Sequence, residues 1–289
     1  MKTKFKFSSK FPHKRAFVTG AGSGFGQQFA LDLAGDGWHL GLTDLNASAL
    51  ETTARLVAGA GGSSETFAFD VSDESAYQQA AHSFLRNNGG IDLLINNAGV
   101  GDSGRVGDYS LTNWRWLLDI NLLGVIHGCH FFIPQMRKQQ SGHIINIASA
   151  AAFASMPTMA AYNVSKAGVV ALSETISCEL AHHKVGVTAV MPEFVRTNIM
   201  QHSRNRDADL DEMARLYVNT SGLTPQMVVP MILQKAARGT HSIVFPARAK
   251  LVRALSRFAP GFWRFVRRYM HRNQAKVLAT LQKAEAKQA

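Results

Sequence analysis

The segment Thr19-Gly20-Ala21-Gly22-Ser23-Gly24-Phe25-Gly26 decides the fold, because its glycines join a predicted strand to a predicted helix. We predict the strand over residues 14–19 and the helix over residues 27–35. Glycines at such a turn let the backbone approach a pyrophosphate, whose charge binds amides at the helix N-terminus. Three glycines at fixed spacing also arise by chance, so this prediction needs the support of its surroundings.

Strand and helix patterns alternate along the chain beyond this segment. The next strand is predicted over residues 38–43, and further elements follow at 65–69, 74–87, 91–96, 111–139, 143–148, 161–182, 185–191 and 242–245. This alternation indicates βαβ units and a parallel sheet covered on both faces. We therefore expect an α/β fold, a Rossmann-type doubly wound parallel sheet forming a single domain over residues 16–246, with helices on both faces.

Asp44 ends the second predicted strand, 24 positions after Gly20. A carboxylate at this place meets the ribose of a bound adenosine. It would bond the ribose hydroxyls but repel a 2′-phosphate, and no Lys or Arg stands at the neighbouring Ser23 or Leu45. NAD is therefore favoured over NADP as the cofactor. The alternative interpretation is an ordinary glycine-rich turn.

Ser149 follows the predicted strand 143–148, and Tyr162 and Lys166 lie at i and i+4 of the next helix. This spacing puts the phenol and the ammonium on one helical face. A free phenol has a pKa of about 10, so using its anion near neutral pH costs roughly 4 kcal/mol. We expect Lys166 to lower that cost, and Ser149 to donate a hydrogen bond to the substrate oxygen. The alternative is a surface Tyr and Lys on an amphipathic helix.

Together these motifs resemble the short-chain dehydrogenase/reductase family over residues 17 to about 197. The segment Asn96-Asn97-Ala98-Gly99 also matches the family, and Asn121 matches the helix Asn that holds a water against the catalytic lysine. The resemblance implies four catalytic residues, Ser149, Tyr162, Lys166 and Asn121. It implies cofactor contacts from Gly20, Ser23, Gly24, Phe25, Gly26, Asp44, Leu45, Asp70, Val71, Asn97, Ala98, Gly99, Tyr162, Lys166, Pro192, Val195 and Thr197.

The family's chemistry is hydride transfer between a nicotinamide and an alcohol, ketone or aldehyde, with Tyr162 passing the proton. Family subunits pair through the helices that carry Asn121 and Tyr162, so a homodimer or homotetramer is expected. Glu193 departs from the glycine that usually follows Pro192, so the backbone near the nicotinamide is expected to turn differently and the local charge to be more negative. The alternative from another class is a non-catalytic NAD-binding scaffold that recruits a partner through its basic termini.

Positive charge is concentrated at the two ends of the chain. The net charge is +11, from 31 Lys and Arg against 20 Asp and Glu. Residues 1–15 hold six basic residues and no acid, and residues 235–289 hold thirteen basic residues and one acid. We predict a basic N-terminal arm over 1–15 and a basic amphipathic helical tail over 247–289. An anionic membrane surface or a partner protein is favoured over nucleic acid as their target.

Two segments lie outside the alternation and are expected to shape the substrate pocket. Residues 196–226 are polar and predict an irregular excursion that roofs the pocket, while residues 150–159 line it. Met156 and Met159 are either core residues or include one that touches the substrate. In the tail, apolar residues recur at helical spacing on both sides of Pro260-Gly261. The tail either lies on an anionic bilayer and takes in a lipophilic substrate, or packs on its own subunit or a neighbour.

Composition limits the remaining classes. With 46% hydrophobic and 18% charged residues, the chain is neither a disordered tail nor a membrane-spanning bundle. No run of about 20 apolar residues is present, and no apolar leader follows the basic start. Cys129 and Cys178 are far apart in predicted helices, which indicates a reducing compartment, so we expect a cytoplasmic protein. Peripheral membrane contact is expected only if the tail binds the bilayer rather than protein. His182-His183 does not predict a metal site, because adjacent helical residues point apart.

Overall fold

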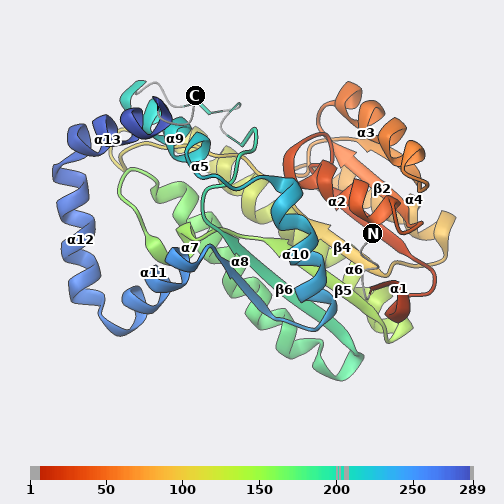
Figure 1. The fold of residues 1–289 in the computed structure, drawn as a ribbon. Coiled ribbons are helices and arrows are strands. Elements are labelled where there is room, and N and C mark those ends of the chain that lie inside the picture. Colours follow the sequence, from red (N-terminus) through yellow and green to blue (C-terminus); the bar gives the residue numbers. More distant parts are fainter. Residues whose placement is uncertain (1–6, 200, 202, 205–207, 287–289) are drawn as a thin grey trace.

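The computed structural model describes residues 7–199, 201, 203–204 and 208–286, so Lys2, Lys4 and Lys6 of the predicted arm lie outside the described residues. Seven parallel strands form one sheet in the order β3-β2-β1-β4-β5-β6-β7 (Figure 1). The strands are β1 (Arg15–Thr19), β2 (His39–Asp44), β3 (Ser63–Ala68), β4 (Leu93–Asn96), β5 (Gly142–Ile147), β6 (Val185–Pro192) and β7 (Ser242–Phe245). The predicted α/β, doubly wound fold is confirmed.

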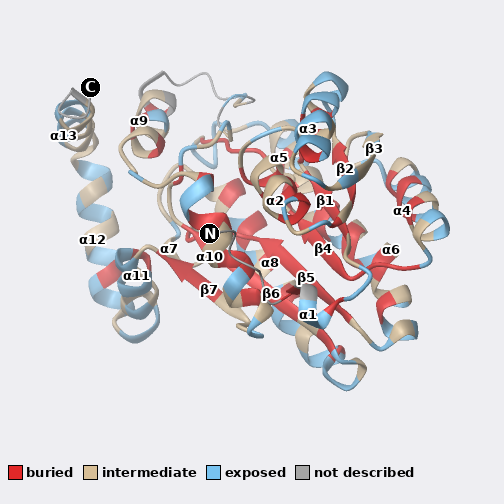
Figure 2. Cartoon of the chain, turned by 45° about the vertical axis from the view of Figure 1, so that its right-hand side comes forward, coloured by how far each residue is buried: buried red, intermediate tan, exposed pale blue. Residues whose placement is uncertain are grey.

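Alternate residues of the strands face two layers of helices. In β1, Ala16 and Val18 face α2 (Gly24–Ala34), α3 (Ala47–Gly59) and α10 (Pro225–Ala237). Phe17 faces the opposite layer, made by α4 (Glu74–Asn88), α6 (Gly124–Gln139) and α8 (Ala160–Glu179), which ends in the short turn η2 (Ala181–His183). Figure 2 shows the strands buried between the layers. Burial on both faces explains why the central strands β4, β5 and β6 are largely apolar, whereas the edge strand β3 is polar and partly exposed.

The order in which strands are added to the sheet reverses at β1. From β1 the chain builds β2 and β3 on one side, and β4 to β7 on the other. At such a point the loops leaving neighbouring strands diverge, which opens a crevice at the carboxyl ends of the strands. The glycine loop follows β1, Asp44 ends β2, and Asn97 follows β4, so three predicted contacts are brought to this crevice.

The helix predicted over 111–139 is continuous but not uniform. It consists of α5 (Leu111–Leu118), a π-helical turn η1 (Asp119–Leu123) and α6. Such π-turns are frequent at functional sites, and this one carries Asn121. By length and composition alone this helix could cross a membrane, a test that core helices also pass. Here Leu117, Asn121 and Phe132 are fully buried, so it serves as a central helix of the domain.

The predicted boundary between an arm and the domain at residue 15 needs correction. A short helix α1 (Phe7–Lys10) precedes β1, and the rings of Phe7 and Phe11 are buried. Phe7 packs edge-on against Trp38 and His143, with centroids 6.3 and 5.4 Å away. Phe7 and Phe11 therefore belong to the hydrophobic core, because burial of their rings is favourable although charged residues flank them.

Helices were also missed. The helices α3, which begins after the Asn46 cap, and α10, which contains Pro230, were not expected from the sequence. Small and β-branched residues in α3 and the proline in α10 weaken the helical pattern. The excursion was expected to be irregular, yet α9 (Ala208–Asn219) lies within it with Leu210 and Leu216 buried. Arg206 and Asp207 of the excursion lie outside the described residues.

The tail forms three helices that wrap one edge of the molecule, α11 (Ala247–Phe258), α12 (Pro260–Arg272) and α13 (Gln274–Ala286) (Figure 1). The predicted break at Pro260 is the start of α12, since proline suits a first helical turn. α11 packs on β7 and on the short α7 (Ala151–Ala154), and α13 packs on α9. Glu285 of α13 accepts hydrogen bonds from Arg215 and Asn219. The tail therefore has one face on its own subunit.

Candidate active site

A cavity of about 870 Å³ runs along the carboxyl ends of the strands. Its size lies within the range typical of ligand pockets. The structure brings nearly all predicted site residues to this cavity. They are Gly20, Ser23, Gly24, Phe25, Asp44, Leu45, Asp70, Val71, Asn97, Ala98, Gly99, Ser149, Tyr162, Lys166, Pro192, Val195 and Thr197. Gly26 and Asn121 are the predicted site residues that do not line it.

The glycine loop is held by the segment after β4. The side-chain amide of Asn97 donates to the carbonyl oxygens of Thr19 and Gly20, at 2.9 and 3.1 Å. Gly20 has a φ of +64°, a conformation that favours glycine. A Cβ on Gly26 would lie 2.0 Å from the Gly20 carbonyl oxygen. The predicted cofactor contact of Gly26 is therefore replaced by a packing role, because this glycine lets α2 approach the loop.

Asp44 is oriented toward the cavity by two backbone amides. Its Oδ2 accepts from the Gly22 amide at 2.9 Å, and its Oδ1 accepts from the Asn46 amide at 3.0 Å. A Cβ on Gly22 would lie 2.8 Å from Oδ2, so only glycine permits this approach. A held carboxylate beside a glycine loop fits a ribose diol and the pyrophosphate next to it. The residues present at this end therefore fit a dinucleotide.

Tyr162 and Lys166 lie on the same side of α8 and both line the cavity. The Lys166 Nζ is 5.8 Å from the centroid of the Tyr162 ring and donates to the Ile147 carbonyl oxygen at 3.1 Å. Ser149 Oγ accepts from the Ala151 amide at 3.1 Å, and it donates to the Pro192 carbonyl oxygen at 3.4 Å. The expected grouping of phenol, ammonium and hydroxyl is thus present in one place.

Burial dominates the electrostatics of this group. Desolvation raises the pKa of Tyr162 to about 12, although a hydrogen bond with Ser149 acts in the opposite direction. Desolvation lowers the pKa of Lys166 to about 8. Both shifts favour the neutral form, whereas the sequence predicted a phenol made more acidic by Lys166. In the protein alone Tyr162 is therefore a proton donor, and it needs added positive charge before it can act as a base.

Asn121 does not reach the cavity. Its Nδ2 donates to the Val100 carbonyl oxygen at 2.9 Å, and the Val100 amide donates to its Oδ1 at 2.8 Å. The same Nδ2 lies 3.4 Å from the Ser165 hydroxyl. These bonds hold the segment after β4 against α8. The side chain of Asn121 is therefore a positioning group, and the contact with Lys166 through a water that the resemblance implied stays a prediction.

Glu193, the departure from the family pattern, pairs with the tail. Its Oε2 is 2.5 Å from Nε of Arg248 on α11. The neighbouring Phe194 stacks on Tyr217 of α9, with ring centroids 4.7 Å apart. The extra negative charge expected near the nicotinamide is therefore paired, and the segment after β6 is linked to both the excursion and the tail.

The rest of the cavity is largely apolar and comes from three segments. The expected lining by residues 150–159 and 196–226 is present, and both Met156 and Met159 are included. The tail contributes the third wall, which was not among the segments expected to line the pocket. Trp263 and Met270 of α12 lie seven residues apart, a spacing that places them on one side of that helix and could have revealed this wall. The apolar lining residues include Trp116, Ile120, Met156, Met159, Ile199, Leu210, Met213, Val218, Val252, Trp263, Met270 and Val277.

A buried carboxylate ties the excursion down, and no motif in the sequence pointed to it. Asp102 is 2% exposed and accepts hydrogen bonds from the hydroxyls of Tyr109 and Ser203, at 2.6 and 3.0 Å. The backbone amide of Arg204 lies 3.3 Å from the same carboxylate, and its guanidinium stands 4.1 Å over the Trp116 ring. These contacts hold the start of the excursion over the cavity.

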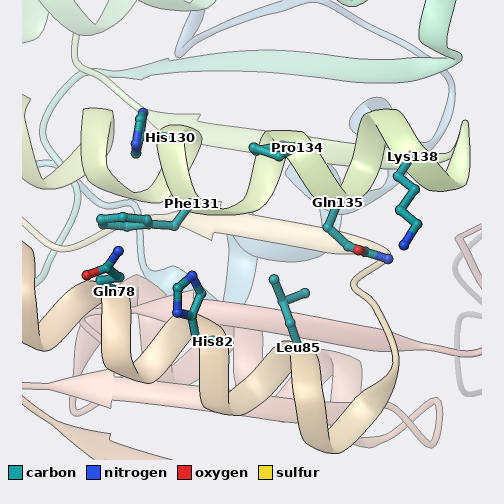
Figure 3. A pocket seen from close by; sticks show the side chains of 8 residues that line it. All are labelled: Gln78, His82, Leu85, His130, Phe131, Pro134, Gln135 and Lys138. Carbon is teal, nitrogen blue, oxygen red and sulfur yellow. The ribbon is translucent and has the colours of Figure 1, made fainter.

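A second, more open hollow lies on the outer surface between α4 and α6 (Figure 3). His82 of α4 and His130 of α6 are both among the residues that line this hollow. It contains none of the predicted site residues. Its lining residues are Gln78, His82, Leu85, His130, Phe131, Pro134, Gln135 and Lys138.

Comparison with known proteins agrees with this geometry. A family model described as short chain dehydrogenase matches residues 14–208. A putative oxidoreductase SadH of Mycobacterium tuberculosis is 30% identical over 253 residues, which cover 86% of this chain and 92% of SadH. A probable oxidoreductase EphD of the same organism is 35% identical over 184 residues, which are 63% of this chain. The matched part is 31% of EphD, so this chain spans less than a third of that longer relative.

Solved structures show the same fold. A short chain dehydrogenase/reductase from Burkholderia phymatum in complex with NAD superposes with a TM-score of 0.78 at 35% identity, covering 83% of this chain and 92% of that one. A metagenomic short-chain oxidoreductase in complex with NADP superposes with a TM-score of 0.68 at 28% identity, covering 81% and 96%. Similar structures thus hold either dinucleotide.

Proposed function

Since the chain belongs to the short chain dehydrogenase family, we propose that it is an NAD-dependent oxidoreductase that interconverts a lipophilic alcohol and its ketone or aldehyde. One observation carries the proposal. A single cavity is lined at one end by the glycine loop and Asp44, and at the other by Ser149, Tyr162 and Lys166. A dinucleotide held at the first end would place its nicotinamide near the groups that can move a proton.

In the reductive direction the Tyr162 hydroxyl donates its proton to the substrate oxygen. Its raised pKa keeps it protonated at neutral pH, and the Ser149 hydroxyl holds the same oxygen by a hydrogen bond. A bound nicotinamide supplies the hydride exchange and, when oxidised, a positive charge. In the oxidative direction Tyr162 takes the proton back, and Lys166 in its charged form favours the phenolate. Burial excludes water from this group. The attraction of the Tyr162 phenolate to the Lys166 ammonium and to an oxidised nicotinamide is therefore stronger than it would be in solvent.

The preference for NAD rests on Asp44. Its carboxylate is held in place by the amides of Gly22 and Asn46. A 2′-phosphate at this position would meet that negative charge without a cation at Ser23 or Leu45. We expect NAD to bind at least about tenfold more tightly than NADP, and Asp44→Ser to narrow the ratio. Titration with NADH and NADPH, followed by the fluorescence of the reduced nicotinamide, measures the two dissociation constants. An unchanged ratio of these constants in Asp44→Ser would refute this role of Asp44.

A lipophilic substrate is supported by the apolar wall that faces Tyr162, to which the excursion and the tail contribute. Pairing of subunits through α6 and α8 is supported by three apolar side chains left exposed on η1, α6 and α8. These are Leu123, Ile126 and Val164. Burying such side chains between copies would stabilise a dimer.

The test is turnover, measured by the absorbance of the reduced nicotinamide with a panel of steroids, retinoids, long-chain alcohols and sugars. We expect a long-chain or polycyclic compound to react, and Tyr162→Phe to lower kcat by about a hundredfold or more. Tyr269→Phe removes the same hydroxyl from an exposed site on α12 and should leave kcat unchanged. NAD binding without turnover across the panel would favour a non-catalytic scaffold and refute the proposal.

A further inference from the structure

The outer side of the tail carries an uncovered apolar surface. We call it the tail face and define it by Leu251, Phe258, Phe262, Phe265 and Tyr269, whose exposed fractions lie between 57 and 81%. Phe262, Phe265 and Tyr269 are three and four residues apart, so they share one side of α12. Figures 1 and 2 show α12 at the edge of the molecule. Among the described residues none covers these side chains.

The opposite side of α12 is occupied. Trp263 is buried, and its indole N–H donates to the Ala154 carbonyl oxygen at 3.0 Å. Trp263 and Met270 line the cavity. Helix α12 therefore has two apolar sides, one that closes the substrate cavity and one that faces outward. Packing within the subunit accounts for the first side only.

Charge on α11 and α12 has a single sign. Residues 247–272 contain eight Lys and Arg and no Asp or Glu. Arg248 pairs with Glu193, and Arg267 donates to the Ser155 carbonyl oxygen. Arg264, Arg268 and Arg272 are exposed on α12 beside the tail face. An apolar strip bordered by arginines is typical of helices that lie in the headgroup region of a membrane.

We propose that the tail face docks on an anionic phospholipid bilayer. The aromatic rings enter the boundary between headgroups and acyl chains, and the arginines bind phosphate groups around them. A second copy of the chain fits this face poorly, because the exposed Arg264, Arg268 and Arg272 beside it would oppose the same arginines of the second copy. The surface alone supports the docking. That the cavity behind α12 then receives its substrate from the bilayer rests in addition on the proposed function.

Co-sedimentation with vesicles tests the docking without any assay of turnover. The full chain should pellet with vesicles of phosphatidylcholine mixed with phosphatidylglycerol and stay in solution with phosphatidylcholine alone. Added salt should release it, because the attraction between arginine and phosphate at a surface is screened.

Two sets of variants separate the aromatic and the charged contributions. The triple variant Phe258→Ser, Phe262→Ser and Phe265→Ser should lower the partition coefficient by about tenfold or more. The triple variant Arg264→Gln, Arg268→Gln and Arg272→Gln should lower it by about a hundredfold.

Matched controls change equally exposed side chains elsewhere and should pellet like the unmodified chain. The apolar control is Leu56→Ser, Val106→Ser and Met227→Ser, and the charge control is Arg55→Gln, Arg86→Gln and Arg238→Gln. Unaltered circular dichroism and NAD binding would show that each variant is folded.

The proposal is overturned if the chain does not pellet with anionic vesicles, or if it pellets equally with neutral ones. It is also overturned if the tail variants and their controls behave alike, or if the aromatic variant instead dissociates a dimer in light scattering. A protein that turns over substrate but does not bind vesicles leaves the proposed function standing and removes the docking.

Discussion

Removing the indole of Trp263 should release α12 from the body of the protein. Trp263 is 8% exposed and is the one buried residue of α12. Its N–H bond to the Ala154 carbonyl oxygen joins the tail to α7, and its ring lines the substrate cavity. The ends of the tail are held separately, by α11 on β7 and by α13 on α9. We therefore expect Trp263→Ala to open the middle of the tail without unfolding the domain.

The size of the effect follows from the contacts that are lost. Large-to-alanine changes of buried aromatics cost about 3–5 kcal/mol when the surroundings are rigid, and a neutral hydrogen bond contributes about 1 kcal/mol. Since α12 is a surface helix that can relax, we take about 3 kcal/mol for Trp263→Ala. That free energy raises the population of the open tail by roughly a hundredfold. Trp263→Phe keeps a ring but loses the bond, so about a fivefold change is expected.

Hydrogen exchange of the α12 amides measures this opening directly. Exchange should accelerate by the stated factors in the two variants, while the amides of β1 and β4 keep their protection. With a lipophilic substrate, KM should rise more than kcat falls, because the apolar wall is lost and the Tyr162 group is untouched. Phe262→Ala, at an exposed neighbouring position, should change neither quantity. Unaltered α12 exchange in Trp263→Ala would refute the view that this side chain holds the wall.

Further predictions concern other parts of the structure. Asp102→Asn presents a donor to the hydroxyls of Tyr109 and Ser203, so it should destabilise the excursion by about 1–3 kcal/mol; faster exchange at residues 203–204 and a raised KM would support this, and unchanged exchange would contradict it. Lys166→Met should abolish turnover yet stabilise the fold. Burial lowers the pKa of Lys166 from 10.5 to about 8, so the buried charge costs about 3 kcal/mol of folding free energy. Loss of the hydrogen bond to the Ile147 carbonyl oxygen in the variant offsets part of the gain. The gain of about 1–2 kcal/mol should be complete below pH 8 and vanish as pH rises to 10.5, where the unfolded chain also loses the proton; urea unfolding across this range measures it, and equal stabilities near neutral pH would contradict it. Phe7→Ala should lower the free energy of unfolding by about 3–5 kcal/mol, because its ring is buried against Trp38 and His143; the same urea midpoint as the unmodified chain would mean that the N-terminal segment is a free arm.

Much of the fold was predictable because strands and central helices carry strong local patterns. The strand predicted over 242–245 coincides with β7, and the helix predicted over 74–87 with α4 to within one residue. α3 and α10 were missed because small residues and Pro230 dilute the apolar repeat that identifies a helix. Phe7 and Phe11 were read as part of a charged arm, since local sequence does not show which rings will find a core.

In the candidate site, too, the sequence predicted some residues and their places but not others. Asp44, Tyr162 and Lys166 could be placed from spacing, because strand ends in a parallel sheet meet and i, i+4 residues share a helical face. Asn121 could be recognised but not located, since its amide contacts the Val100 backbone instead of the cavity. The pairing of Glu193 with Arg248 joins residues 55 positions apart, and nothing in either neighbourhood predicts it.

The local sequence alone thus determined which residues form the phosphate loop and the proton-transfer group, because turns and helical repeats depend on residues only a few positions apart. Contacts between distant segments decided the shape of the cavity, the pairing of Glu193 and the role of the tail as a wall. The shift of Tyr162 toward a higher pKa belongs to this second class as well. Desolvation depends on everything that surrounds a group, and that surrounding exists only after the excursion, α7 and the tail have closed over the sheet.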